Sequence, residues 1–154
     1  MELKSILTST KVGELTLTTR PTLSPDDTVA AAAAEMRRES HGSAVVCSDG
    51  ALVGIFTERD LLRVIGSGDG MQTPLSSVMT TDPKTLTTDD TLFDAVRWMD
   101  EGGYRRLPVV GPDGTSVGIV DVKTITHFLV EHFSSAVYNQ ASAVQLTAKN
   151  PEGA

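Results

Sequence analysis

The sequence is poor in cysteine, in positive charge and in long hydrophobic runs, and each shortage excludes a class of protein. A single cysteine, Cys47, cannot form an internal disulfide, which makes a reducing cytosol the expected compartment. The 13 basic residues are outnumbered by 20 acidic ones, and the net charge of −7 disfavours nucleic acid, which requires a basic face. No segment approaches the roughly 20 apolar residues that span a bilayer, and the amino terminus lacks the apolar core of a signal peptide. We therefore expect a cytoplasmic protein with no nucleic-acid or membrane partner.

Catalytic and metal-binding motifs are missing as well. His41, His127 and His132 show no ligand spacing with one another or with Cys47, so we expect no metal site. The sequence contains no Ser/Cys–His–acid set, no carboxylate pair in an apolar setting and no P-loop, so we expect no enzyme activity. Cys47 ends the apolar run that starts at Ala44, which favours a buried structural thiol over a reactive one.

The pattern that the sequence does contain is a duplicated unit. Residues 20–60 and 82–124 share a Thr-Leu pair, an Asp-Asp-Thr helix start, a Val-Val run, an Asp-Gly turn and a Gly-Ile pair, at an offset of about 63 to 64 residues. A half of roughly 60 residues would bury only about 60% of its unfolded surface and be marginal alone. We therefore expect the two halves to share a core, with space for a ligand at their junction.

Each half is predicted to run strand, helix, strand, strand, helix. This is an α/β (α+β) fold of two β-α-β-β-α repeats packed about a pseudo-twofold axis, and right-handed crossovers should place the helices on one face of each small sheet. The predicted strands are 21–23, 43–47, 52–56, 85–86, 107–110 and 117–120, and the predicted helices are 29–39, 58–65, 91–101 and 122–133. The predicted divisions are a lead-in (1–14) with a short helical turn, a first repeat (15–66), a linker (67–77), a second repeat (78–133) and a tail (134–154) with a mobile end.

The order of the motifs identifies a resemblance. Gly54-Ile-Phe-Thr-Glu-Arg-Asp60 follows the first Asp-Gly turn, and Leu107-Pro-Val-Val110 precedes the second. This order resembles the cystathionine-β-synthase (CBS) domain, and the two copies resemble a CBS pair, or Bateman module, over about residues 15–133. Because nothing remains outside the pair for an attached enzyme or channel, the chain is similar to CBS-only proteins.

The resemblance implies a non-catalytic sensor module that forms homodimers. Such a module would bind an adenosine-containing ligand (AMP, ADP, ATP, NAD or S-adenosylmethionine) in the cleft between the repeats and modulate a partner protein. No tightly bound cofactor is expected. The alternative is a structural dimerisation module whose clefts stay empty. Trp98 and Tyr104, two aromatic residues near a helix end, are a candidate dimer contact.

Thr57 and Asp60 are the candidate centre of the ligand site. Thr57 precedes a predicted helix, where free backbone N–H groups and the helix dipole favour an anion. Asp60 lies one turn further and can accept both hydroxyls of a ribose. The resemblance implies the same roles, with the Asp on the ribose and the Thr near the sugar and phosphate. Alternatively, both residues serve only the start of the helix.

The second copy departs from the first at both positions. Asp121 stands in place of the Thr, and Thr124 in place of the Asp. Thr124 offers no carboxylate to a ribose, and Asp121 places negative charge where a phosphate would approach. We therefore predict one occupied nucleotide site, and Asp121 also suits a helix N-cap.

Arg105 and Arg106 are the candidate phosphate ligands. The resemblance implies a basic pair at this place, and the first copy carries His41-Gly42 at the positions taken as matching. Arginine binds phosphate bidentately, at about 1.5–3 kcal/mol per charge-assisted hydrogen bond. The alternative is a surface pair bridged to Asp100 or Glu101, worth under about 1 kcal/mol.

The remaining candidates complete the site. The resemblance implies an adenine slot along the first strand and the hairpin strands, although these residues could equally be plain core. The adenine candidates are Thr22, Leu23, Ala44, Val45, Ile55 and Phe56. Arg59 and Lys123 are lesser phosphate candidates, with a solvated face as the favoured alternative, and His41 is either a histidine that titrates near a bound phosphate or, the favoured interpretation, a loop residue without a role.

Overall fold

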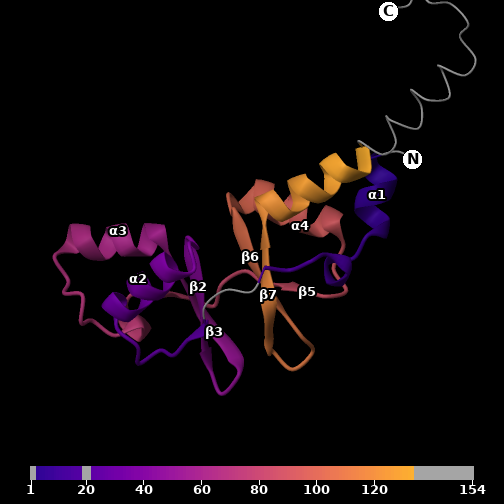
Figure 1. The fold of residues 1–154 in the computed structure, drawn as a ribbon. Helices are drawn as coiled ribbons and strands as arrows, with labels where there is room; N and C mark the ends of the chain where they lie inside the picture. The colour runs from indigo at the N-terminus through magenta and orange to yellow at the C-terminus, as the bar shows by residue number, and fades with distance from the viewer. Residues whose placement is uncertain (1–2, 19–21, 134–154) are drawn as a thin grey trace, which may run out of the picture.

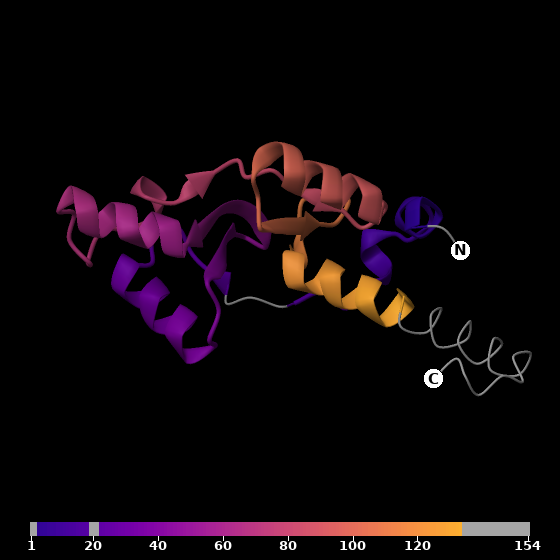
Figure 2. The ribbon, with the colours of Figure 1, turned by 90° about the horizontal axis from the view of Figure 1, so that it is seen from above.

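Two small sheets, one from each repeat, form the centre of the computed structural model, which describes residues 3–18 and 22–133. The first repeat consists of β1 (Thr22–Leu23), α2 (Val29–Arg38), β2 (Ser43–Ser48), β3 (Ala51–Thr57) and α3 (Glu58–Ser67). The second repeat consists of β5 (Leu86–Thr87), α4 (Leu92–Gly102), β6 (Arg106–Val110), β7 (Ser116–Asp121) and a helix over residues 122–133. The strands of the two repeats lie next to each other in the middle, and the helices lie on the outer sides (Figures 1 and 2). The predicted α+β fold of two repeats is confirmed.

Threonine residues set the starts of helices α3 and α4. Thr57 precedes α3 and Thr91 precedes α4, and each hydroxyl accepts a hydrogen bond from the backbone N–H three residues later. The residue at that third position, Asp60 or Asp94, accepts one in return from the threonine N–H. These reciprocal bonds are capping boxes, so the local sequence alone specifies where both helices begin.

The apolar residues gather in three clusters. The first lies inside the first repeat and the second inside the second repeat. The third, which we call the inter-repeat cluster, joins the two sheets and consists of Val45, Cys47, Ile55 and Ile119. The shared core expected from the small size of each half is therefore provided by one face of β2, β3 and β7.

The pseudo-twofold axis passes between the two hairpins. Leu52 N–H donates to the Gly114 carbonyl at 3.1 Å, and Ser116 N–H donates to the Gly50 carbonyl at 3.4 Å. These two bonds exchange under the 64-residue offset, and Ala51 and Thr115 form a bridge between them. The repeat in the sequence is thus a structural symmetry.

The segments that precede the repeats are exchanged between them, which the sequence did not predict. Residues 80–81 form β4 (Thr80–Thr81), which pairs with β3 of the first repeat, although they lead into the second. Correspondingly, Thr18 leads into the first repeat and exchanges two backbone hydrogen bonds with Ile119 of β7, at 3.3 and 3.0 Å. Each sheet is therefore completed by chain that belongs to the other half.

The cores are exchanged in the same way. Val12 and Leu15 are buried in the core of the second repeat. The short 3₁₀ helix that contains Val12 (Val12–Glu14) donates two backbone hydrogen bonds to that repeat. Leu75, in the 3₁₀ helix Leu75–Ser77, is fully buried in the first repeat. The predicted lead-in and linker are consequently parts of the two cores rather than spacers between them.

Two glycines make the exchange possible. A Cβ at Gly54 would lie 2.9 Å from the Thr80 carbonyl oxygen, and a Cβ at Gly118 would lie 2.9 Å from Leu17 Cβ. Contacts this short do not occur in folded proteins, so a side chain at either position would displace the crossing segment. This close approach explains why glycine opens the Gly-Ile motif in both copies.

The ends of the chain extend the second repeat. The helix α1 (Leu3–Ser9), which the sequence did not predict, packs against α4. The tail at 134–154, predicted to have a mobile end, lies outside the described residues. Within residues 3–18 and 22–133, no helix has both the length and the apolar character that crossing a membrane requires.

Candidate functional site

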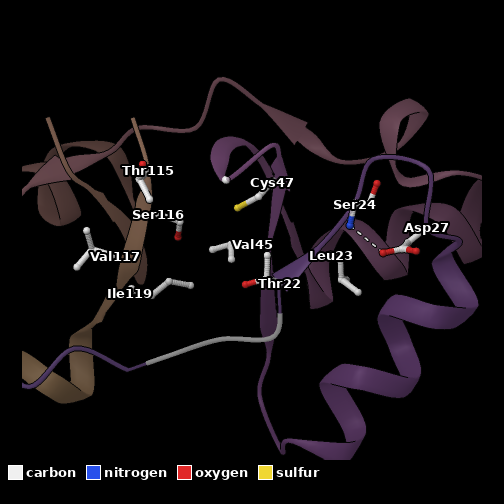
Figure 3. A pocket seen from close by; sticks show the side chains of 12 residues that line it. Thr22, Leu23, Ser24, Asp27, Val45, Cys47, Thr115, Ser116, Val117 and Ile119 are labelled. Carbon is white, nitrogen blue, oxygen red and sulfur yellow. Dashed lines mark hydrogen bonds between the residues drawn. The ribbon is translucent and has the colours of Figure 1, made fainter. Parts of the chain in front are cut away.

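A pocket of about 590 Å³ lies between the first repeat and the hairpin of the second (Figure 3). This volume is within the range of roughly 300–1,000 Å³ that small-molecule sites occupy. Strands β1 and β2 form one wall, and β7 forms the other. The lining residues are Thr22, Leu23, Ser24, Asp27, Val45, Cys47, Gly50, Thr115, Ser116, Val117, Gly118 and Ile119.

The pocket combines an apolar floor with hydroxyl groups and one carboxylate. Val45 and Ile119, which are 3% and 0% exposed, come from opposite repeats, and the hydroxyls of Thr22 and Ser116 lie near them (Figure 3). Asp27 is the one charged residue among those that line it, and its Oδ2 accepts a hydrogen bond from Ser24 N–H at 2.7 Å. A flat apolar ring with polar edges suits such a pocket.

Only part of the predicted site lines this pocket. Thr22, Leu23 and Val45 do, as the adenine slot requires. Ala44 and Phe56 are fully buried in the core of the first repeat, and Ile55 belongs to the inter-repeat cluster. The other predicted residues, Thr57, Arg59, Asp60, Arg105, Arg106 and His41, do not line it.

Five of the lining residues that the sequence analysis missed, residues 115–119, come from the second repeat, and four, Ser24, Asp27, Cys47 and Gly50, come from the first. The prediction grouped strands of one copy with the Thr57–Asp60 motif of the same copy. The structure instead places β1 and β2 of the first repeat against residues 115–119 of the second. The duplication in the sequence was the available signal. It predicts a twofold arrangement, in which strands of the first repeat face the second hairpin, and that arrangement would have identified residues 115–119.

Asp60 is held by internal hydrogen bonds. It is 2% exposed, and its carboxylate accepts from Thr57 N–H at 3.0 Å, from the Thr57 hydroxyl at 3.2 Å and from the Thr80 hydroxyl at 3.2 Å. Arg63 Nη1 donates to the same carboxylate at 3.3 Å. Asp60 therefore caps α3 and also ties it to β4, the strand exchanged from the other half.

The start of α3 offers less to an anion than expected. Glu58 N–H donates to the Gly42 carbonyl at 3.1 Å, and Asp60 N–H donates to the Thr57 hydroxyl at 3.3 Å. Two of the N–H groups that the sequence analysis took as free are thus satisfied within the first repeat. The negatively charged side chain of Glu58 opens the helix beside them.

Arg106 is paired within its own repeat and also contacts the other. Its Nε lies 3.2 Å from Asp121 Oδ2, an ion pair by distance, although this Nε makes no hydrogen bond of acceptable geometry. Its Nη2 reaches the first repeat and lies 2.9 Å from where a Cβ of Gly42 would be, and Glu58 Oε1 lies 2.7 Å from the same point. The guanidinium is therefore paired with Asp121 and lies near a second carboxylate, which belongs to the first repeat.

The strand register corrects one correspondence. In β6–β7 Arg106 pairs with Asp121, and in β2–β3 Ser43 pairs with Thr57. Ser43, rather than Gly42, therefore occupies the position of Arg106, and Gly42 occupies that of Arg105. The Ser43 hydroxyl is fully buried and has no hydrogen-bond partner, which is unusual for a buried polar group.

Asp121 is the last residue of β7 and follows Ile119, the last lining residue of that strand, by two positions. Its side chain is on the same face of the strand as Ile119, about 7 Å further on, because same-face residues are two positions apart. Its Oδ1 accepts a hydrogen bond from Lys123 N–H at 2.8 Å, so it caps the helix over residues 122–133. A ligand that fills the pocket and extends along β7 would meet the Asp121–Arg106 pair.

The Cys47 thiol is buried, and its environment does not favour a reactive thiolate. Burial raises the pKa of the Cys47 thiol, although a hydrogen bond with Ser116 opposes the shift, and a thiol with a raised pKa is a poor nucleophile. Within the part of the chain that the structure describes, no group of three or more His, Cys, Asp or Glu residues is placed to hold a metal ion.

The fold and the pocket define a class of protein, namely two interlocked repeats with space for a small molecule between them. The sequence model of the CBS domain matches residues 12–67 and 75–131, and the chain belongs to the CBS domain family.

Known proteins similar to this chain support the assignment. The uncharacterized 17.7 kDa protein in bps2 3'region of Acidianus ambivalens is 35% identical over 124 residues, which are 80% of this chain and 75% of that one. The CBS domain-containing protein CBSCBSPB3 of Arabidopsis thaliana is 32% identical over 127 residues, which are 79% of this chain but 23% of the plant protein. The structure of the CBS domain protein PAE2072 from Pyrobaculum aerophilum, complexed with AMP, matches with a TM-score of 0.69 and 23% identity, and the match covers 74% of this chain and 88% of that one. At 23% identity, this structural match supports the assignment of the fold alone.

Proposed function

We propose that the protein is a non-catalytic sensor that binds an adenosine-containing ligand between its two repeats. The observation that carries the proposal is the pocket between β1–β2 and β7, which has the volume of a small-molecule site and includes Thr22, Leu23 and Val45 of the predicted adenine slot. The AMP complex of PAE2072, a protein of the same fold, is consistent with this ligand class.

Calorimetry with AMP, and with two tryptophan variants, tests the proposal. Thr22 and Thr85 occupy equivalent positions in the two repeats, at the edges of β1 and β5. Thr22→Trp should fill the pocket and weaken AMP binding at least about tenfold, a change of about 1.4 kcal/mol. Thr85→Trp leaves that pocket open and should bind AMP as the parent does.

Each outcome of this experiment has a clear meaning. If Thr85→Trp abolishes binding and Thr22→Trp does not, the ligand occupies the equivalent position beside β3 and Asp60, the residue that the sequence analysis assigns to the ribose. If neither AMP, ADP, ATP, NAD nor S-adenosylmethionine produces heat, the sensor proposal is wrong and the structural module remains. Turnover of any of these compounds by the purified protein would contradict the non-catalytic part.

Regulation would follow from the position of the ligand across two repeats in a homodimer. A ligand that touches β1 and β7 can shift the equilibrium between two tilts of the repeats. The free energy of that shift is no larger than the difference between the ligand's binding free energies for the two tilts.

The surface for the second copy would be α3, where Leu62 and Ile65 are 69% and 62% exposed. Exposed apolar side chains on one helix are typical of an interface.

Small-angle scattering tests both statements. The parent protein should have the mass of a dimer, and AMP should change its maximum dimension. The double variant Leu62→Glu/Ile65→Glu should have the mass of a monomer, because two carboxylates would be buried in the contact. Met71→Glu, at another exposed apolar residue, is the control and should remain dimeric. A dimeric double variant would exclude α3 as the interface.

A further inference from the structure

The charges around the cleft restrict which adenosine-containing ligand fits. We infer, on the basis of the proposed function, that the pocket selects neutral or cationic adenosyl compounds, such as adenosine or S-adenosylmethionine, and disfavours polyphosphates such as ATP. The inference depends on the carboxylates of Asp27 and Asp121 and on the pairing of Arg106.

One carboxylate lines the pocket, and a second follows its last lining residue along β7. Asp27 lines one end, and no lysine or arginine is among the lining residues. Asp121 follows Ile119 on the same face of β7, and its side chain is 13% exposed, so a ligand that extends along β7 meets a partly desolvated carboxylate that is paired with Arg106. A ribose diol can donate to such a carboxylate, whereas a phosphate is repelled by it.

The arginine beside Asp121 already has a partner. Arg106 Nε lies 3.2 Å from Asp121 Oδ2, and the Glu58 carboxylate also lies near the guanidinium, since both approach the point where a Cβ of Gly42 would be. A phosphate would therefore have to compete with Asp121 for this guanidinium. On the first repeat, Arg63 is bound to Asp60, and backbone N–H groups at the start of α3 are bound to Gly42 and Thr57.

The balance of these groups gives the order of affinity. A phosphate monoester carries about 1.5 to 2 negative charges at neutral pH, and ATP carries more. Each added phosphate meets these carboxylates, and no lysine or arginine among the lining residues is available to pair with it. Affinity should therefore fall from adenosine or S-adenosylmethionine through AMP to ATP, by at least about tenfold between the ends of the series.

Calorimetry in magnesium-free buffer with adenosine, S-adenosylmethionine, AMP and ATP tests the order. Raising the ionic strength from about 0.01 to 0.15 M shortens the Debye length from about 30 to 8 Å. Because salt screens repulsion as well as attraction, ATP should then bind more tightly and S-adenosylmethionine more weakly. ATP binding that equals or exceeds that of adenosine, or that weakens with salt, overturns the inference.

A matched pair of variants locates the effect. Asp121→Asn keeps a good helix cap but removes the charge and releases Arg106, so ATP should bind about tenfold more tightly. Asp89→Asn makes the same change in net charge at a side chain that is 88% exposed and should leave the ATP affinity unchanged. Equal effects of the two variants overturn the assignment to Asp121. If no adenosyl compound binds at all, the proposed function fails and this inference fails with it, a result distinct from a preference for ATP.

Discussion

Replacing Leu75 with alanine is expected to lower the free energy of unfolding by about 3–4 kcal/mol. The sequence places Leu75 in a linker, where such a change would cost little, but the side chain is fully buried in the core of the first repeat. Its N–H also donates to the Asp27 carbonyl at 2.8 Å, which holds the linker against the start of α2. Urea denaturation followed by far-UV circular dichroism measures the loss.

Met71 and Trp98 supply the controls for this prediction. Met71 lies in the same linker and is 40% exposed, so Met71→Ala should change the free energy of unfolding by no more than about 0.5 kcal/mol. Trp98 is the single tryptophan and packs against the core of the second repeat. If the exchanged segments make the repeats one cooperative unit, Leu75→Ala shifts the tryptophan fluorescence transition as much as the dichroism transition. An unshifted fluorescence transition would mean that the repeats unfold separately.

The elements within each repeat could be predicted because local signals specify them. Thr-x-x-Asp capping boxes start α3 and α4, Gly103 ends α4 in a left-handed conformation, and Asp-Gly turns connect the hairpins. The exchange of Val12 and Leu75 between the repeats could not be predicted, because a short apolar segment carries no information about which of two similar cores it enters. In a duplicated chain, the two alternatives have almost the same local sequence.

The pairing of residues at the candidate site could not be predicted from the sequence. Thr22, Leu23 and Val45 were assigned to an adenine slot because of the family resemblance, and the structure places these three residues along the pocket. Their partners in β7 depend on how the two sheets face each other, which is decided by the inter-repeat cluster and by the hairpin contact at Ala51 and Thr115. The charged residues are harder still, because the pairing of Arg106 with Asp121 depends on strand register rather than on sequence spacing.

The asymmetry between the copies acquires a physical meaning from these contacts. Where the first repeat has the hydroxyl pair Ser43 and Thr57, the second has the ion pair Arg106 and Asp121 at the same register. The first position leaves a buried hydroxyl without a partner, and the second places a carboxylate beside the pocket. Two sites related by symmetry in the backbone therefore differ in the charge that they present to a ligand.

Asp60→Ala is expected to lower the free energy of unfolding by about 3 kcal/mol, through two separable losses. Removal of the capping box costs about 1 kcal/mol. In addition, the hydrogen bond from the Thr80 hydroxyl to the buried Asp60 carboxylate is lost, and a hydrogen bond to a charged group contributes about 1.5–3 kcal/mol. Thermal and urea denaturation at pH 7 measure the sum.

Asp94→Ala is the matched control, because Asp94 forms the same capping box with Thr91 but has no contact equivalent to that with Thr80. It should cost only about 1 kcal/mol. The hydrogen bond from the Thr91 backbone N–H lowers the pKa of Asp94 below its ordinary 3.8, so its contribution is complete at pH 7 and is lost as the pH falls through the lowered pKa. Equal costs for the two variants would contradict the link between α3 and β4.

AMP binding separates the structural role of Asp60 from a role in the ligand site. If Asp60 also holds the ribose, Asp60→Ala weakens AMP binding about tenfold under conditions where the variant is fully folded, while Asp94→Ala does not. Unchanged AMP affinity in folded Asp60→Ala would leave Asp60 a purely structural residue and assign the ligand to the pocket beside β7.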